Sequence, residues 1–248
     1  MFDPFKDFEQ AGYLRNRYGE KDPEIVRALE HELFRAGLDE AIAYLAGCRT
    51  IGYADFLAVH RILFSAFYPW TGQDRATTAP DIAVTKAGTW FSHPIDACLA
   101  VEEGLRIGQN RKQLRQRPGE VMGLFAYGHP FLDGNGRTML VVHSELCQRA
   151  GFCIEWHKTR KVDYLAALSK EISSPGQGIL DAYLLQFVGD VQERHLWGGM
   201  IGALAGLDGQ GAEDTIAGDY SSAEVSQQYR EFEQRRGYQI GPDTNERE

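Results

Sequence analysis

The chain has 248 residues, of which 43% are hydrophobic, so it can bury a sizeable core as one large domain or as one domain with an appendage. Its formal net charge of −9 argues against binding to nucleic acid, which depends on clustered Lys and Arg that neutralise phosphates. The absence of a CxxC pair, of a leader-like N-terminus and of an apolar stretch of roughly 18 residues predicts a cytoplasmic protein without a membrane span.

Apolar residues recur with helical spacing through most of the chain. A first stripe begins at Pro23 and continues past Gly37, and a second covers residues 53–67 and stops before Pro69. Further helical patterns cover residues 94–106, 120–125 and 136–150 and parts of 162–188. We therefore expect a mostly helical, all-α fold.

The period changes at one place, residues 82–91. The stretch IAVTK alternates apolar with small or polar residues, Ala87 and Gly88 give a turn, and TWF resumes the extended pattern. We therefore expect a short β-hairpin within the helical protein.

The C-terminal quarter differs in composition from the rest. It is Gly-rich at LWGGMIGALAGLDGQG and then carries a polar amphipathic stretch at residues 222–236. We expect residues 1–190 to form the main domain with an N-terminal helical segment. Residues 191–248 would then form an appendage that is partly flexible or binds a partner.

The stretch HPFLDGNGRTML, residues 129–140, holds the candidate chemistry. Asp-Gly and Asn-Gly steps most often mark turns, so the simplest interpretation is a loop ahead of a helix. A calcium loop is excluded because Arg137 and Thr138 stand where a ligand and a glycine would be needed. A dinucleotide-binding fingerprint is excluded because Met139 replaces its third glycine.

A phosphate site fits the order of residues better. Gly134, Asn135 and Gly136 let successive backbone amides point into one concavity at a helix N-terminus, where the helix dipole favours anions. Arg137 adds a permanent positive charge, which is unfavourable at that end of a helix unless an anion is present. Asp133 supplies a hard oxygen ligand suited to Mg²⁺.

His129 is the candidate general base, because its ordinary pKa lies near neutrality. A lone histidine is more often a structural residue. The neighbouring phosphate nest, acid and arginine favour the catalytic interpretation here.

The stretch resembles the motif HxFx(D/E)GNGRxxR of the Fic family at seven of its eight fixed positions. YPWTGQDR, residues 68–75, is similar to the segment that leads to the family's flap, and IAVTKAGTWF is similar to the flap hairpin. GYLRNRYG, residues 12–19, resembles the N-terminal segment of the toxin and secreted-effector branch.

The resemblance implies a helical Fic fold with a β-hairpin flap, and an enzyme that transfers AMP from ATP, with Mg²⁺, to a Ser, Thr or Tyr hydroxyl of a target protein. Membership of the effector branch would imply secretion into a host cell. The flap would hold the target as an added strand. The implied site residues are the base His129, the Mg²⁺ ligand Asp133, the nucleotide-binding Gly134, Asn135, Gly136, Arg137 and Lys86, and the flap residues Ile82, Ala83, Val84 and Thr85.

The chain departs from the family at Leu140, where the motif has its second arginine. In the family that arginine contacts the γ-phosphate and pairs with an inhibitory glutamate in the pattern (S/T)xxxE(G/N). In this chain only Glu248 has a Ser or Thr four residues before it, namely Thr244. The resemblance thus leaves either a separate small antitoxin-like inhibitor or no such control. Two alternatives stay open, namely an enzyme with another nucleotide or phosphate-containing donor, and a catalytically weakened binding or regulatory protein.

Overall fold

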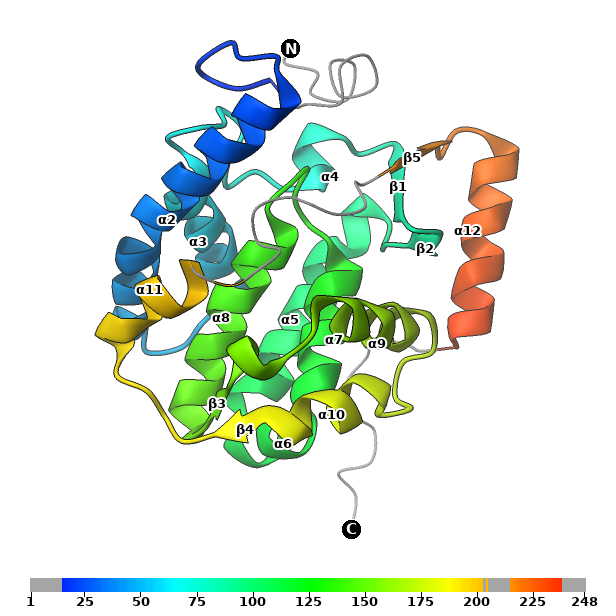
Figure 1. Ribbon diagram of the computed structural model, residues 1–248. Coiled ribbons are helices and arrows are strands. Elements are labelled where there is room, and N and C mark those ends of the chain that lie inside the picture. Colours follow the sequence, from blue (N-terminus) through cyan, green and yellow to red (C-terminus); the bar gives the residue numbers. More distant parts are fainter. Residues whose placement is uncertain (1–14, 203, 205–214, 238–248) are drawn as a thin grey trace.

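A central helix, α7 (Pro118–Gly128), organises the fold of the computed structural model, which describes residues 15–202, 204 and 215–237. Every residue of α7 is buried, and α5, α8, α9 and α10 pack around it. α2 and α3 pack on α8 at the side away from α9, where α11 also lies against α2 (Figure 1).

The helices have the following bounds: α2 Pro23–Gly47, α3 Tyr53–Phe64, α4 Arg75–Thr78, α5 Ala97–Gln109, α6 Arg111–Gln116, α8 Asn135–Ala150, α9 Lys161–Ser173, α10 Ile179–Leu184, α11 Trp197–Gly202 and α12 Ala223–Arg236. Short 3₁₀ helices are η1 Pro94–Asp96, η2 Trp156–Lys158, η3 Leu185–Phe187 and η4 Arg194–Leu196. The strands are β1 Ile82–Lys86, β2 Thr89–Trp90, β3 Cys153–Ile154, β4 Val188–Gly189 and β5 Thr215–Asp219.

The first helix begins where its sequence predicts. Asp22 caps α2 by accepting hydrogen bonds from the amides of Glu24 and Ile25, and Pro23 occupies the first helical position, where its missing N–H costs nothing. The apolar stripe of α2 is buried and continues past Gly37 without a break. The expectation of a mostly helical fold is confirmed. Within the described ranges no helix is both long and apolar enough to cross a bilayer.

The predicted hairpin is present as β1 and β2. Ala87 and Gly88 have φ of 48° and 80°, the two positive values that a tight two-residue hairpin turn requires. Thr85 pairs with Trp90 and Lys86 with Thr89 in an antiparallel ladder.

β5, from the C-terminal part of the chain, adds a third strand to this hairpin on the other edge of β1. α12 follows it and runs beside the hairpin towards α9 (Figure 1). A second, two-stranded sheet joins β3 to β4.

Candidate functional site

His129 lies at the C-terminal end of the central helix, where the chain turns towards α8. Its amide donates a hydrogen bond to the Phe125 carbonyl (3.2 Å), and its backbone is left-handed, with φ of 42°. The imidazole stacks flat on Phe91, with ring centroids 3.7 Å apart. Since Phe91 directly follows β2, the flap hairpin sets the orientation of the candidate base.

Arg75 clamps the same turn from α4 and is fully buried. Its Nε donates to the His129 carbonyl (2.7 Å), its Nη2 to the Ser92 carbonyl (2.9 Å), and its amide to the Pro130 carbonyl (2.6 Å). One side chain therefore joins the segment before the flap, the segment after it and the motif. Arg75 belongs to the segment YPWTGQDR, and nothing in that pattern predicts this clamp.

Asn135 braces the motif loop from inside. Its Oδ1 accepts a hydrogen bond from the Phe131 amide (2.9 Å), and its Nδ2 donates to the Phe131 carbonyl (2.8 Å). The expected contact between this side chain and a phosphate stays a prediction, because in the structure both polar atoms hold the loop. Phe131 is fully buried and anchors the loop in the apolar core.

His60, on α3, packs against the motif loop. The sequence patterns did not predict this role. Its ring stacks on Phe131 at 3.7 Å between centroids. Nδ1 accepts the Gly72 amide (2.9 Å), so Nε2 carries the proton and donates to the Asp133 carbonyl (3.1 Å). Burial lowers the pKa of His60 to about 3 and keeps the ring neutral. A histidine on an apolar helix face gives no sequence signal for this role.

The loop ends in a backbone nest at the start of α8. The amides of Asn135, Gly136 and Arg137 belong to the first turn, where a helix supplies no carbonyl partner. Gly134 has φ of 78°, and a Cβ there would lie 2.6 Å from the Phe64 ring. A Cβ on Gly136 would meet nothing within 4 Å. Gly134 therefore shapes the loop, whereas Gly136 leaves open space in front of the helix.

Asp133 presents the one hard oxygen ligand of the motif. Its side chain is 44% exposed and accepts a hydrogen bond from the Gly134 amide (2.6 Å). No cluster of three or more His, Cys, Asp or Glu side chains suited to a metal occurs among the described residues. This donor set fits Mg²⁺ held through one carboxylate together with nucleotide phosphates, and does not fit an all-protein metal cage.

Arg137 forms a buried ion pair that no pattern in the sequence predicts. Its Nη2 lies 2.7 Å from Oε1 of Glu30 on α2, and its guanidinium lies over the Phe64 ring at 4.6 Å. Both side chains are less than a tenth exposed. An internal carboxylate therefore lies beside this arginine, and the contact of Arg137 with the outer phosphates stays a prediction. Glu30 lacks the expected inhibitory pattern, because Val26 stands four residues before it.

Burial affects the pKa values of Glu30 and Arg137 differently. Burial raises the pKa of Glu30 to about 7, an effect that Arg137 opposes. Burial also disfavours the charge on Arg137, but the carboxylates of Glu30 and Asp133 outweigh it and raise the pKa of the guanidinium. Arg137 therefore remains charged. The Nη1 atom of Arg137 is buried without a hydrogen-bond acceptor, so the guanidinium retains donor capacity beyond Glu30.

Leu140 lies in the apolar core at 6% exposure, so the helix is core-like at the position of the missing arginine.

The flap residues are placed differently from the expectation. Ile82, Ala83, Val84 and Thr85 form β1, but each pairs with a residue of β5. β5, from the C-terminal part of the chain, occupies this edge, and docking of a target on the flap stays a prediction. Lys86 ends β1 beside the turn, and its contact with nucleotide or target stays a prediction.

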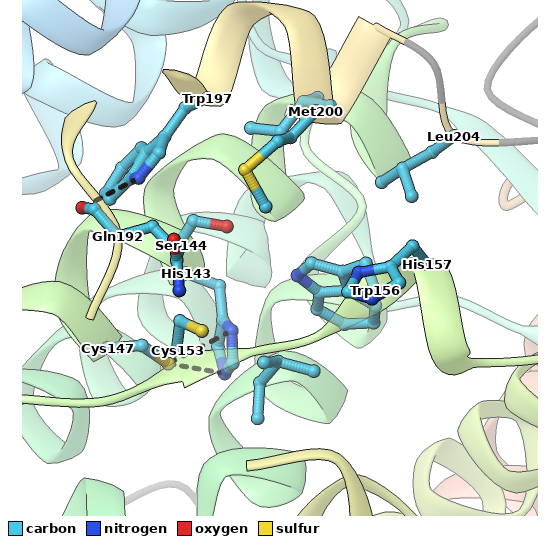
Figure 2. Close-up of a pocket in the computed structure, with 12 residues that line it drawn as sticks. His143, Ser144, Cys147, Cys153, Trp156, His157, Gln192, Trp197, Met200 and Leu204 are labelled. Carbon is cyan, nitrogen blue, oxygen red and sulfur yellow. Dashed lines mark hydrogen bonds between the residues drawn. The ribbon is translucent and has the colours of Figure 1, made fainter. Parts of the chain in front are cut away.

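A cavity of about 220 Å³ lies away from the motif, between α8, η2 and α11 (Figure 2). Trp156, Trp197 and Met200 form much of its apolar wall. At its floor Cys147 Sγ lies 3.5 Å from Nδ1 of His143, whose Nε2 donates to the Pro118 carbonyl (2.9 Å). Burial lowers the pKa of His143 to about 4. Among the residues that the structure describes, no carboxylate and no motif residue lines this cavity, so it is not the candidate reaction site.

Comparison with known proteins agrees with the motif. Residues 50–147 match the Fic/DOC family. The Sinorhizobium fredii protein named "Probable protein adenylyltransferase y4lH" is 27% identical over 169 residues, which are 64% of this chain and 83% of that protein. The Bartonella schoenbuchensis protein named "Protein adenylyltransferase VbhT" is 30% identical over 118 residues, which are 44% of this chain and 23% of that protein.

Solved structures share the fold. The N-terminal Fic domain of a VirB-translocated Bep effector protein from Bartonella quintana, with bound ADP, has a TM-score of 0.64 at 18% identity; the match covers 79% of this chain and all of that one. BepC from Bartonella tribocorum, with bound AMPPNP, has a TM-score of 0.57 at 18% identity; the match covers 72% of this chain and 93% of that one. The expected Fic fold is therefore confirmed.

Proposed function

We propose that the chain is a protein adenylyltransferase that moves AMP from ATP to a hydroxyl group of a target protein, because residues 50–147 match the Fic/DOC family. The names of both curated relatives support this reaction class. The observation that carries the proposal is the motif loop itself. His60, Arg75 and Asn135 hold it in one conformation, with His129 at one end and the open first turn of α8 at the other.

The reaction follows from the order of groups along this loop. The target hydroxyl oxygen attacks the α-phosphorus of ATP, His129 accepts the hydroxyl proton, and the bond to the leaving pyrophosphate breaks. The first-turn amides of α8 bind the α-phosphate as negative charge develops on it. Stacking on Phe91 orients the imidazole, and Arg75 holds the His129 backbone, so the base is already positioned when the target arrives.

Mg²⁺, when bound, would neutralise charge on the phosphates. Asp133 is the residue that would hold it. Its carboxylate is partly exposed, lies directly before the nest, and is 3.6 Å from Arg137. The role of Arg137 towards the outer phosphates requires the guanidinium to use its spare donors or to leave Glu30.

The target would pair with β1 of the flap, which adds backbone hydrogen bonds without demanding a particular sequence. A Ser, Thr or Tyr hydroxyl is the acceptor. Control by a separate small inhibitor and secretion into a host cell both stay predictions.

Two observations favour a second function, a Fic-fold binding protein without transfer activity. Leu140 removes one phosphate-binding charge, and Glu30 occupies the other. This chain would then hold a nucleotide or a protein without modifying it.

Labelling with two forms of ATP separates these functions. Purified chain, Mg²⁺ and candidate targets are incubated with ATP labelled at the α- or the γ-phosphate, for the wild type and for His129→Ala. We expect label from the α position only, and its loss in His129→Ala. His195→Ala, which removes a 70% exposed histidine, is the matched control and should label normally. Absence of His129-dependent label from ATP and the other nucleoside triphosphates would favour the binding protein.

A further inference from the structure

β1 is paired on both sides in this structure. β2 pairs with Thr85 and Lys86 on one edge, and β5 pairs antiparallel with Ile82 to Thr85 on the other. Ile82 lies opposite Asp219 and Thr85 opposite Thr215, and the Tyr220 amide extends the ladder by donating to the Asp81 carbonyl (2.8 Å). The hydrogen-bonding groups that would receive an incoming strand are therefore already used by the chain itself.

α12 anchors β5 by contacts to the body of the domain. The Tyr229 hydroxyl accepts a hydrogen bond from the His93 amide (2.9 Å) and lies 3.2 Å from the Tyr127 hydroxyl. Arg236 is buried, stacks over the Tyr127 ring at 3.4 Å and donates to the Ile172 carbonyl (2.9 Å). A short isolated strand would pair only weakly, so these contacts explain why β5 remains in place.

The backbone of β5 at Gly218 is adapted to its place between β1 and α12. Gly218 has φ of 144°, and a Cβ there would lie 2.7 Å from Cγ2 of Val225 on α12. The ladder shifts register between Ala83 and Val84, so that Gly218 lies opposite Ala83 and Ile216 opposite Val84. The glycine thus lets the strand bulge while α12 packs closely behind it.

We propose that β5 is an internal occupant of the target-docking edge, and that a target segment must displace it to pair antiparallel with β1. This inference rests on the proposed function, because it takes β1 as the docking strand. The partner it describes is an extended segment with a small residue opposite Ala83 and an apolar residue opposite Val84, the positions that Gly218 and Ile216 fill now. Release of α12 is then part of target binding.

A reversible staple tests the displacement. Thr85→Cys and Thr215→Cys, introduced together at directly opposed positions, should form a cross-strand disulfide that locks β5 on β1. We expect target labelling to rise at least tenfold when the staple is reduced, with unchanged ATP affinity. The wild type under the same redox conditions controls for the four native cysteines. Clear labelling that is equal in the oxidised and reduced forms overturns the proposal, because targets would then use another edge.

A binding measurement tests the edge without any catalysis. A fluorescent peptide copying residues 213–222 is titrated against full-length chain and followed by anisotropy. The variant Gly218→Val with Tyr229→Phe, which weakens both β5 and its anchor, should bind the peptide at least tenfold more tightly than the oxidised staple does. Gln234→Ala, on the exposed face of α12, is the control and should bind like the wild type.

The two experiments separate the two claims. Peptide binding to the weakened variant, blocked by the staple, supports β5 as the occupant even if no label is ever transferred. Failure of the weakened variant to bind the peptide any better than the stapled form overturns the proposal, whatever the labelling shows.

Discussion

The two glycines that flank Asn135 in the nest, Gly134 and Gly136, should respond in opposite ways to an added methyl group. In Gly134→Ala the new Cβ lies 2.6 Å from the Phe64 ring, and the residue keeps a left-handed φ of 78°. Phe64 is 1% exposed and stacks with Phe34 at 5.8 Å, so the ring cannot move away freely. The left-handed backbone and the overpacking together should cost about 2–5 kcal/mol of unfolding free energy.

Gly136→Ala is the matched control for this change. Its backbone is helical and its Cβ meets nothing within 4 Å, so alanine should stabilise the helix by about 0.5–1 kcal/mol. The same methyl group enters the space in front of the nest amides, where the α-phosphate is proposed to lie. We therefore expect weaker ATP binding in Gly136→Ala despite its greater stability.

Urea unfolding of the wild type and both variants measures the stabilities, and calorimetric titration with ATP and Mg²⁺ measures the affinities. An unfolding free energy of Gly134→Ala within about 1 kcal/mol of the wild type would contradict tight packing of Gly134 against Phe64, because a tightly packed site cannot accept a methyl group at so small a cost. Full ATP affinity in Gly136→Ala would show that the phosphates do not approach this turn.

Three further changes test the charges around the motif. Glu30→Gln removes the carboxylate that pairs with Arg137, so the unfolding free energy should fall by about 2–3 kcal/mol while the affinity for ATP rises about tenfold. An unchanged ATP affinity in a calorimetric titration would assign Arg137 a purely structural role. Leu140→Arg should increase the preference for ATP over ADP in a calorimetric titration, at a cost in stability because position 140 is buried; equal binding of the two nucleotides would place the γ-phosphate elsewhere. His60 resists protonation in the folded chain because burial lowers its pKa to about 3, so the unfolded chain takes up the proton first and stability falls as pH drops from about 6.5 towards 3. His60→Gln should lose that part of the acid dependence in urea unfolding at several pH values, and an identical pH profile would contradict it.

The sequence predicted those features that depend on residues close together in the chain. The stripe after Pro23 gave α2, the positive-φ positions at Ala87 and Gly88 gave the hairpin, and the glycine-rich motif gave a loop that opens a helix. Each is set by local backbone preference and by a periodic apolar face.

The features that sequence reasoning missed depend on which faces meet. Arg137 pairs with a residue 107 positions away, and Thr85 contacts a strand 130 positions away. Periodicity shows that a face is buried without showing what covers it. A polar stretch such as residues 222–236 gave even less signal, because α12 holds its position through a few buried groups on an otherwise exposed helix.

The two halves of the motif therefore differ in how ready they are for a nucleotide. The amides at the start of α8 and the stacked ring of His129 are fixed by neutral contacts that do not need to change when phosphate arrives. Arg137 is fixed by an opposite charge, and any phosphate that recruits it must compete with Glu30. Since Leu140 offers no second cation, binding of the α-phosphate should depend on the nest, whereas recognition of the outer phosphates should depend on one contested arginine. Selectivity for the length of the phosphate chain, more than binding itself, is what the substitution at position 140 weakens.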